Sequence, residues 1–135
     1  MTDVYILSAA RTAIGTFGGS LSGFGPIDLA SHAAKAAIAR AGVDPAQIGT
    51  SVWGHVLNTE PRDMYLSRVA AMNAGIPETT PAMNVNRLCG SGAQAIVSAQ
   101  GGRLVAHSDG PGLGSVFTVE LDAGGPVPLS SGGLS

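Results

Sequence analysis

The stretch Asn84-Val85-Asn86-Arg87-Leu88-Cys89-Gly90-Ser91-Gly92 is the most informative part of this sequence, and it holds the only cysteine among 135 residues. An apolar, strand-like run leads into it, and an alanine-rich, helix-like run begins at Ser91. Cys89 is therefore predicted at a strand-to-helix turn, where free backbone N–H groups and the helix dipole favour negative charge. Gly90 and Gly92 have no Cβ, which leaves room for a substrate carbonyl beside those amides.

A thiol in such a place has two interpretations. As a thiolate it is a nucleophile. A free cysteine is also commonly a small buried apolar residue. The spacing alone leaves both interpretations open.

Outward from this turn, the first hundred residues alternate between strand-like and helix-like runs. Helix signals are strong around residues 29–41, where Asp28 is the expected N-cap and Gly42 the expected residue after the helix. The order β-α-β-α-β-α predicts an α/β fold with helices packed on a sheet. The expected strands are residues 4–9, 51–55 and 81–86, and the expected helices are residues 29–41, 63–74 and 91–98.

After Gln100 the pattern changes. Alternating runs at 103–108 and 115–121 flank a glycine-rich loop, which predicts a β-hairpin over 101–121. Residues 122–135 are rich in glycine, proline and serine and are predicted to be a disordered tail.

Composition excludes several classes of function. The net charge of −2 provides no basic surface for nucleic acid. No apolar run reaches the ~20 residues that span a bilayer, so no membrane partner is expected. A single cysteine builds no disulfide framework, no metal site is predicted, and the N-terminus has no basic signal region. We expect a cytoplasmic protein.

Residues 1–100 resemble the N-terminal part of the thiolase family, the acetyl-CoA acetyltransferases and 3-ketoacyl-CoA thiolases. The resemblance rests on residues 8–21, on Trp53-Gly54-His55-Val56 and above all on residues 84–92. Residues 58–66 are similar to β-ketothiolases of the bacterial polyester-precursor type. The resemblance implies that Cys89 is the nucleophile and that its N–H is one oxyanion-hole donor. It also implies an acyl-CoA substrate without a further cofactor, with Gly90, Gly92 and Met83 near the substrate.

The chemistry implied by the resemblance is a two-step acyl transfer through an acyl-cysteine. In the family this needs an activating histidine, a second cysteine and an asparagine-held water, all from the C-terminal half. The sequence has no second cysteine, and its three histidines, His32, His55 and His107, do not match the positions that the family uses for catalysis. We therefore expect a truncated acyltransferase that is inactive as an isolated chain. The alternatives are a non-catalytic chimeric or remnant fragment and, more weakly, a nucleotide-binding module.

Residues 101–121 resemble the closing hairpin of a sensor histidine kinase ATPase domain. The nucleotide-binding boxes of that family are absent, so the loop 110–114 is better interpreted as turn chemistry than as a phosphate cradle. Together these features predict a boundary at Gln100 between a thiolase part and a kinase-like hairpin. A sequence that is 44% hydrophobic and only half of a larger fold is also expected to self-associate.

Overall fold

The protein is an α/β structure, as the sequence predicts; a computed structural model describes residues 4–111 and 116–120. Two strands form a small parallel sheet, β1 (Ser51–Gly54) and β2 (Ala82–Val85), paired from Ser51 with Ala82 to Gly54 with Val85. The crossover between them contains the 3₁₀ helix η2 (Pro61–Tyr65) and the helix α2 (Leu66–Asn73). The predicted disordered tail, 122–135, lies outside the described residues.

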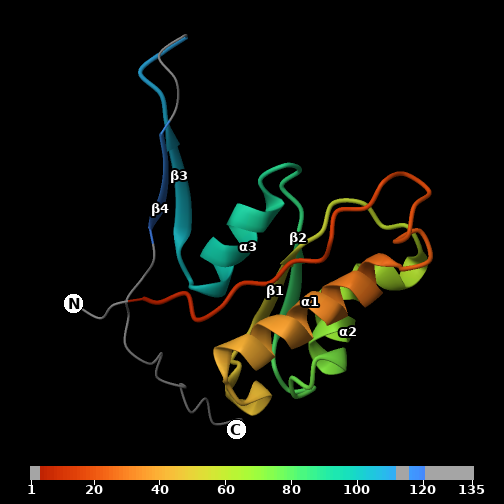
Figure 1. The fold of residues 1–135 in the computed structure, drawn as a ribbon. Helices are drawn as coiled ribbons and strands as arrows, with labels where there is room; N and C mark the ends of the chain where they lie inside the picture. The colour runs from red at the N-terminus through yellow and green to blue at the C-terminus, as the bar shows by residue number, and fades with distance from the viewer. Residues whose placement is uncertain (1–3, 112–115, 121–135) are drawn as a thin grey trace, which may run out of the picture.

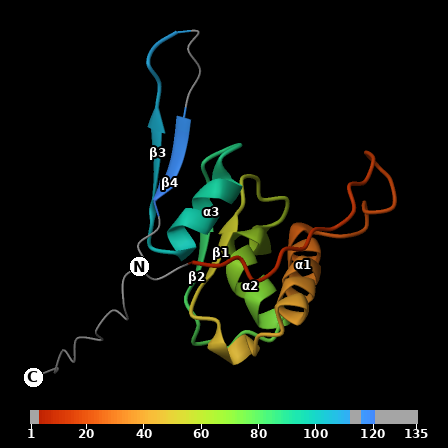
Figure 2. The ribbon, with the colours of Figure 1, turned by 60° about the vertical axis from the view of Figure 1, so that its left-hand side comes forward.

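The body has layers (Figures 1 and 2). Helix α3 (Ser91–Ala99) covers one face of the sheet, α2 covers the other, and α1 (Pro26–Ala41) packs outside α2. The core between α1, α2 and the sheet contains small residues that let the helices approach closely. Trp53 packs against it from β1. The buried members are Ile27, Ala30, Leu66 and Ala70.

Helix α1 begins earlier than predicted. Gly25 is its N-cap and Pro26 its first residue, where the missing N–H of proline has no cost. Asp28 is therefore not the N-cap; its carboxylate accepts a hydrogen bond from the Gly25 N–H at 3.1 Å. Gly42 ends the helix as predicted, with a left-handed φ of 65°.

The predicted strand at Val4–Ala9 is wrong, because no described segment pairs with these residues in a ladder. Side-chain contacts hold the segment along α1 instead. The Ser8 hydroxyl donates to the Ala37 carbonyl at 2.6 Å, and Arg40 donates to the Ala9 carbonyl at 2.8 Å. The apolar side chain of Ile6 is left 88% exposed.

The other elements agree with the prediction within a few residues. The first three residues of the predicted helix 63–74 belong to the 3₁₀ helix η2, and another 3₁₀ helix, η1 (Pro45–Gln47), precedes β1. A β-hairpin follows α3 as predicted: β3 (Arg103–His107) pairs antiparallel with β4 (Val116–Glu120) and projects from the body (Figure 1). Its loop residues 112–115 lie outside the described residues.

Candidate active site

The strand-to-helix turn predicted around Cys89 is present. Strand β2 ends at Val85 and α3 begins at Ser91. Between them Leu88 has a φ of 47°, the left-handed region that a branched side chain rarely enters. The Asn86 side chain supports this conformation, because its Oδ1 accepts the Leu88 N–H at 3.1 Å.

Ser91 fastens the turn to the start of α3. Its hydroxyl donates to the Leu88 carbonyl at 2.7 Å and accepts from the Arg87 N–H at 2.8 Å. The Ser91 side chain is buried, and both bonds are partly buried. Sequence reasoning missed this role, although a serine at the first position of a predicted helix is a recognisable signal.

Cys89 lies on the outside of this turn as a free, exposed thiol. The alternative of a buried apolar cysteine is therefore wrong. Within the described part of the chain, no acceptor lies in hydrogen-bonding geometry with the Cys89 N–H. The residue thus presents both an accessible sulfur and an N–H that is available to a ligand oxygen, next to a helix N-terminus.

The glycines predicted beside the substrate lie at the start of α3, Gly90 as its N-cap and Gly92 as its second residue. A methyl group on Gly92 would meet no atom within 4 Å, whereas one on Gly90 would contact the Arg87 carbonyl at 3.4 Å. Met83 lies on β2 rather than on the turn, and its side chain is exposed. The substrate-binding role of these three residues stays a prediction.

Gly54, at the end of β1, is a residue whose role the sequence did not reveal. A Cβ on it would lie 2.7 Å from the Ser91 carbonyl carbon and 2.8 Å from the Gly92 nitrogen. Contacts this short with backbone atoms do not occur in proteins, so only glycine fits. The missing side chain lets the end of β1 pack against the backbone at the N-terminus of α3, where the Cys89 turn enters the helix.

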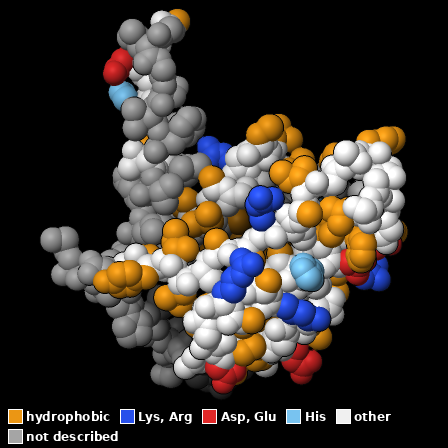
Figure 3. All heavy atoms as spheres, in the orientation of Figure 1, with side chains coloured by type: hydrophobic (Ala, Val, Ile, Leu, Met, Phe, Trp, Pro, Cys, Tyr) orange, Lys and Arg blue, Asp and Glu red, His pale blue; other side chains and the backbone are white. Residues whose placement is uncertain are grey.

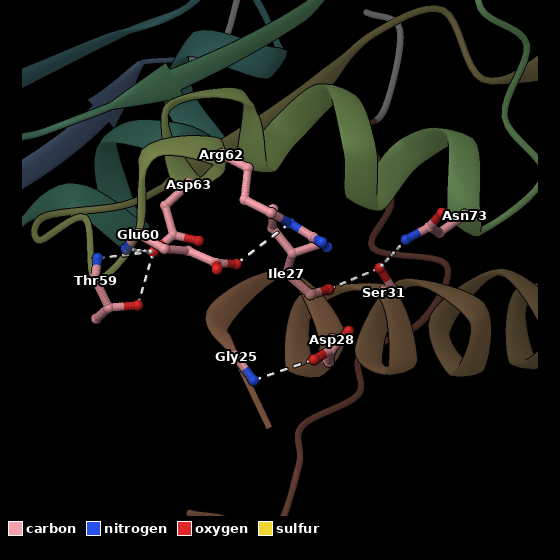
Figure 4. Close-up of polar contacts among 9 residues, drawn as sticks. All are labelled: Gly25, Ile27, Asp28, Ser31, Thr59, Glu60, Arg62, Asp63 and Asn73. Atoms are coloured by element: carbon pink, nitrogen blue, oxygen red, sulfur yellow. Dashed lines mark hydrogen bonds and ion pairs between the residues drawn. The ribbon is translucent and has the colours of Figure 1, made fainter. Parts of the chain in front are cut away.

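A buried carboxylate holds the loop after β1. Asp63 is fully buried, and its Oδ2 accepts from the Thr59 N–H at 2.7 Å, the Thr59 hydroxyl at 2.8 Å and the Glu60 N–H at 3.1 Å (Figure 4). Burial alone would raise the pKa of Asp63. The three hydrogen bonds, with the nearby His55, outweigh it and hold the pKa below the ordinary value of 3.8.

This lowered pKa predicts acid sensitivity. A carboxyl whose pKa is lower in the folded chain binds protons more readily when unfolded, so it stabilises the fold above its unfolded pKa. The stabilisation is lost as pH falls below about 3.8 through the lower folded pKa. Urea unfolding followed across this range should show a falling midpoint, and Asp63→Asn should flatten the fall. Glu78→Gln, which removes the charge of an exposed carboxyl, is the control. If the urea midpoint fell equally steeply with pH in wild type and in Asp63→Asn, Asp63 would not be the source of the acid sensitivity.

Other features of the structure do not converge on Cys89. A cavity of about 770 Å³ opens between the glycine-rich segment and α1, where Arg11, His32 and Lys35 line it, and no residue of the Cys89 turn does. Within residues 4–111 and 116–120, no group of His, Cys, Asp and Glu side chains could hold a metal ion. None of the helices in that part of the chain is long and apolar enough to cross a membrane.

Comparison with known proteins gives a consistent result. The family described as "Thiolase, N-terminal domain" matches residues 4–108. The β-ketothiolase BktB of Cupriavidus necator is 52% identical over 107 residues, which are 79% of this chain and 27% of that protein. The mitochondrial 3-ketoacyl-CoA thiolase of Bos taurus is 44% identical over 98 residues, 73% of this chain and 25% of that protein.

Solved structures agree. The human mitochondrial 3-ketoacyl-CoA thiolase in complex with CoA superposes with a TM-score of 0.68 at 41% identity, covering 70% of this chain and 24% of that chain. The chain thus spans about a quarter of the length of the relatives it matches. The family match extends past Gln100 to residue 108 and so includes β3, and the resemblance of 101–121 to a kinase hairpin gains no support. The chain belongs to the thiolase family, through that family's N-terminal domain.

Proposed function

We propose that this chain carries the acyl-accepting half of a thiolase-type acyl-CoA acyltransferase, with Cys89 as the nucleophile. The single observation that supports this most is the exposed Cys89 thiol beside its own unoccupied N–H at the start of α3. The thiolate would attack the thioester carbonyl, the Cys89 N–H would stabilise the oxyanion, and the CoA thiolate would leave and take up a proton.

By this proposal the chain alone performs only the first half of the reaction. The family's second cysteine and activating histidine belong to the part that this chain does not span, and groups that act as a unit lose most of their catalysis together. A non-catalytic fragment is the competing proposal. A reducing cytoplasm suits a protein whose function needs a free thiol, and remains part of the proposal.

A stoichiometry assay separates the two proposals. The purified chain is mixed with acetyl-CoA, and the release of free CoA is followed against Cys89→Ala. We expect about one equivalent of CoA released per chain, as the acetyl group moves to Cys89, and no steady turnover. Sustained turnover above the Cys89→Ala control would show that the second half of the site is not needed. No transfer at all would favour the non-catalytic fragment.

We also propose that the chain self-associates. Figure 3 shows hydrophobic side chains at the surface along the N-terminal segment and over the loop that follows it. Large exposed apolar patches are uncommon on monomers and mark interaction sites. Size-exclusion chromatography over a range of concentrations should show an apparent mass above one chain that rises with concentration; a monomer at every concentration would contradict this. The most exposed members of this surface are Tyr5, Ile6, Leu7, Ile14 and Phe17.

A further inference from the structure

Two buried polar atoms lack partners in the loop below the Cys89 turn. They are Nε2 of His55 and Oδ1 of Asp63, and no described residue hydrogen-bonds to either. Leaving a buried polar atom unpaired is costly, so each such case in a folded chain needs an explanation.

The two atoms are chemically complementary. Asp63 Oδ2 already accepts three hydrogen bonds, whereas Oδ1 accepts none. Both atoms belong to the segment after β1, with His55 as the first residue beyond that strand and Asp63 in η2, and His55 contributes to the lowered pKa of Asp63. Arg62, the neighbouring basic residue, forms an ion pair with Glu60 at 3.2 Å and does not pair with Asp63 (Figure 4).

The loop that holds these atoms is tied to the Cys89 turn by hydrogen bonds. The His55 N–H donates to the Val85 carbonyl at 3.0 Å, and the Asn86 side chain donates to the Val56 carbonyl at 3.2 Å. The same Asn86 side chain accepts the N–H of Leu88. A displacement of His55 would therefore move Asn86 and, through it, disturb the left-handed backbone conformation of Leu88. Such a conformation persists only while the surrounding structure holds it.

The other side of the loop is fixed to β2. The Asn84 amide donates to the Met64 carbonyl at 2.9 Å and, at 3.4 Å, to the Asp63 carbonyl, and its oxygen accepts the Ser67 N–H at 2.9 Å. Asp63 thus has a firmly held backbone. A hydrogen-bonded link to the Asp63 side chain would therefore hold the His55 ring in one position.

We propose that one water molecule joins the two side chains, accepting the Nε2–H of His55 and donating to Oδ1 of Asp63, and that this pair positions the Cys89 turn. His55 is then a positioning residue: it touches neither the thiol nor the substrate and acts through Val56, Asn86 and Leu88. The role in acyl transfer rests on the proposed function of Cys89, whereas the bond itself does not.

Nuclear magnetic resonance and a double-mutant cycle test the bond. In ¹⁵N spectra of the His55 ring, Nε2 should carry the proton, and Asp63→Asn should shift its resonance. His55→Ala and Asp63→Asn should each lower the urea midpoint, and the double variant should be no less stable than the weaker single variant. Additive losses, or an unprotonated Nε2, would overturn the pairing.

Two reactions of the same thiol test the positioning. Acyl transfer from acetyl-CoA to Cys89 uses the backbone N–H as oxyanion donor, whereas alkylation by iodoacetamide does not. His55→Ala should slow acyl transfer by about tenfold, less than the ~100-fold loss when a donor is removed outright. It should leave alkylation within about twofold, and His55→Gln, which keeps a donor, should restore acyl transfer.

The matched control is His32→Ala, an exposed histidine on α1. Equal slowing of both reactions by His55→Ala, or no rescue by His55→Gln, would reduce His55 to a structural residue. Absence of acyl transfer in the wild type would contradict the proposed function of Cys89 and the positioning role, while the spectra and the cycle would still decide the bond.

Discussion

Replacing Gly54 by alanine should destabilise the chain by about 3 kcal/mol, the upper end of the usual cost of overpacking. The added methyl group would lie within 3 Å of three backbone atoms of Ser91 and Gly92, and backbone cannot rotate aside as a side chain can. Either β1 or the start of α3 must move, and the Cys89 turn moves with it.

Urea unfolding measures this cost. Gly92→Ala is the matched control, because it adds the same methyl group at a place where no atom lies within 4 Å. In the first turn of a helix this change should be neutral or stabilise by up to about 1 kcal/mol. Equal stability of Gly54→Ala and wild type would mean that β1 and α3 are not in contact as described.

Replacing Ser91 by alanine should cost about 2 kcal/mol. The change removes two partly buried hydrogen bonds at once and leaves the Arg87 N–H without its acceptor. The Leu88 carbonyl keeps the bond from the Ser91 N–H at 3.0 Å, which limits the loss. Calorimetric or urea unfolding provides the number.

Ser98→Ala in the same helix is the control for Ser91. Its hydroxyl accepts a single bond, from the Gln94 side chain at 3.0 Å, so this variant should lose clearly less stability. Hydrogen exchange gives a second readout: the Leu88 and Gly90 N–H groups should exchange faster in Ser91→Ala than in wild type. An unchanged exchange rate at both would show that Ser91 does not hold the turn.

Much of this fold could be predicted because its decisive features are local. Gly42 ends α1 since glycine enters the left-handed region readily, and the Cys89 turn lies where an apolar run meets an alanine-rich one. The hairpin of β3 and β4 followed from two alternating runs around a glycine-rich loop. Each of these features is specified by a few neighbouring residues.

What sequence reasoning missed depends on contacts between distant residues. Val4–Ala9 has strand-forming side chains, but a strand also needs a neighbour, and Ser8 bonds to α1 instead. Gly54 and Asp63 lie in stretches that carry the family resemblance, but the sequence alone does not show what either residue does. Their importance comes from the approach of α3 to β1 and from the burial of one carboxylate among backbone N–H groups.

The central claim is that Cys89 accepts an acyl group from a CoA thioester. The most direct test is to incubate the chain with acetyl-CoA, measure its intact mass and map the modified peptide, with Cys89→Ser and wild type unfolded in urea as controls. The account predicts one acetyl group per chain, on Cys89, formed only by the folded protein. Acetylation on lysine alone, or a cysteine that reacts equally fast when unfolded, would contradict it.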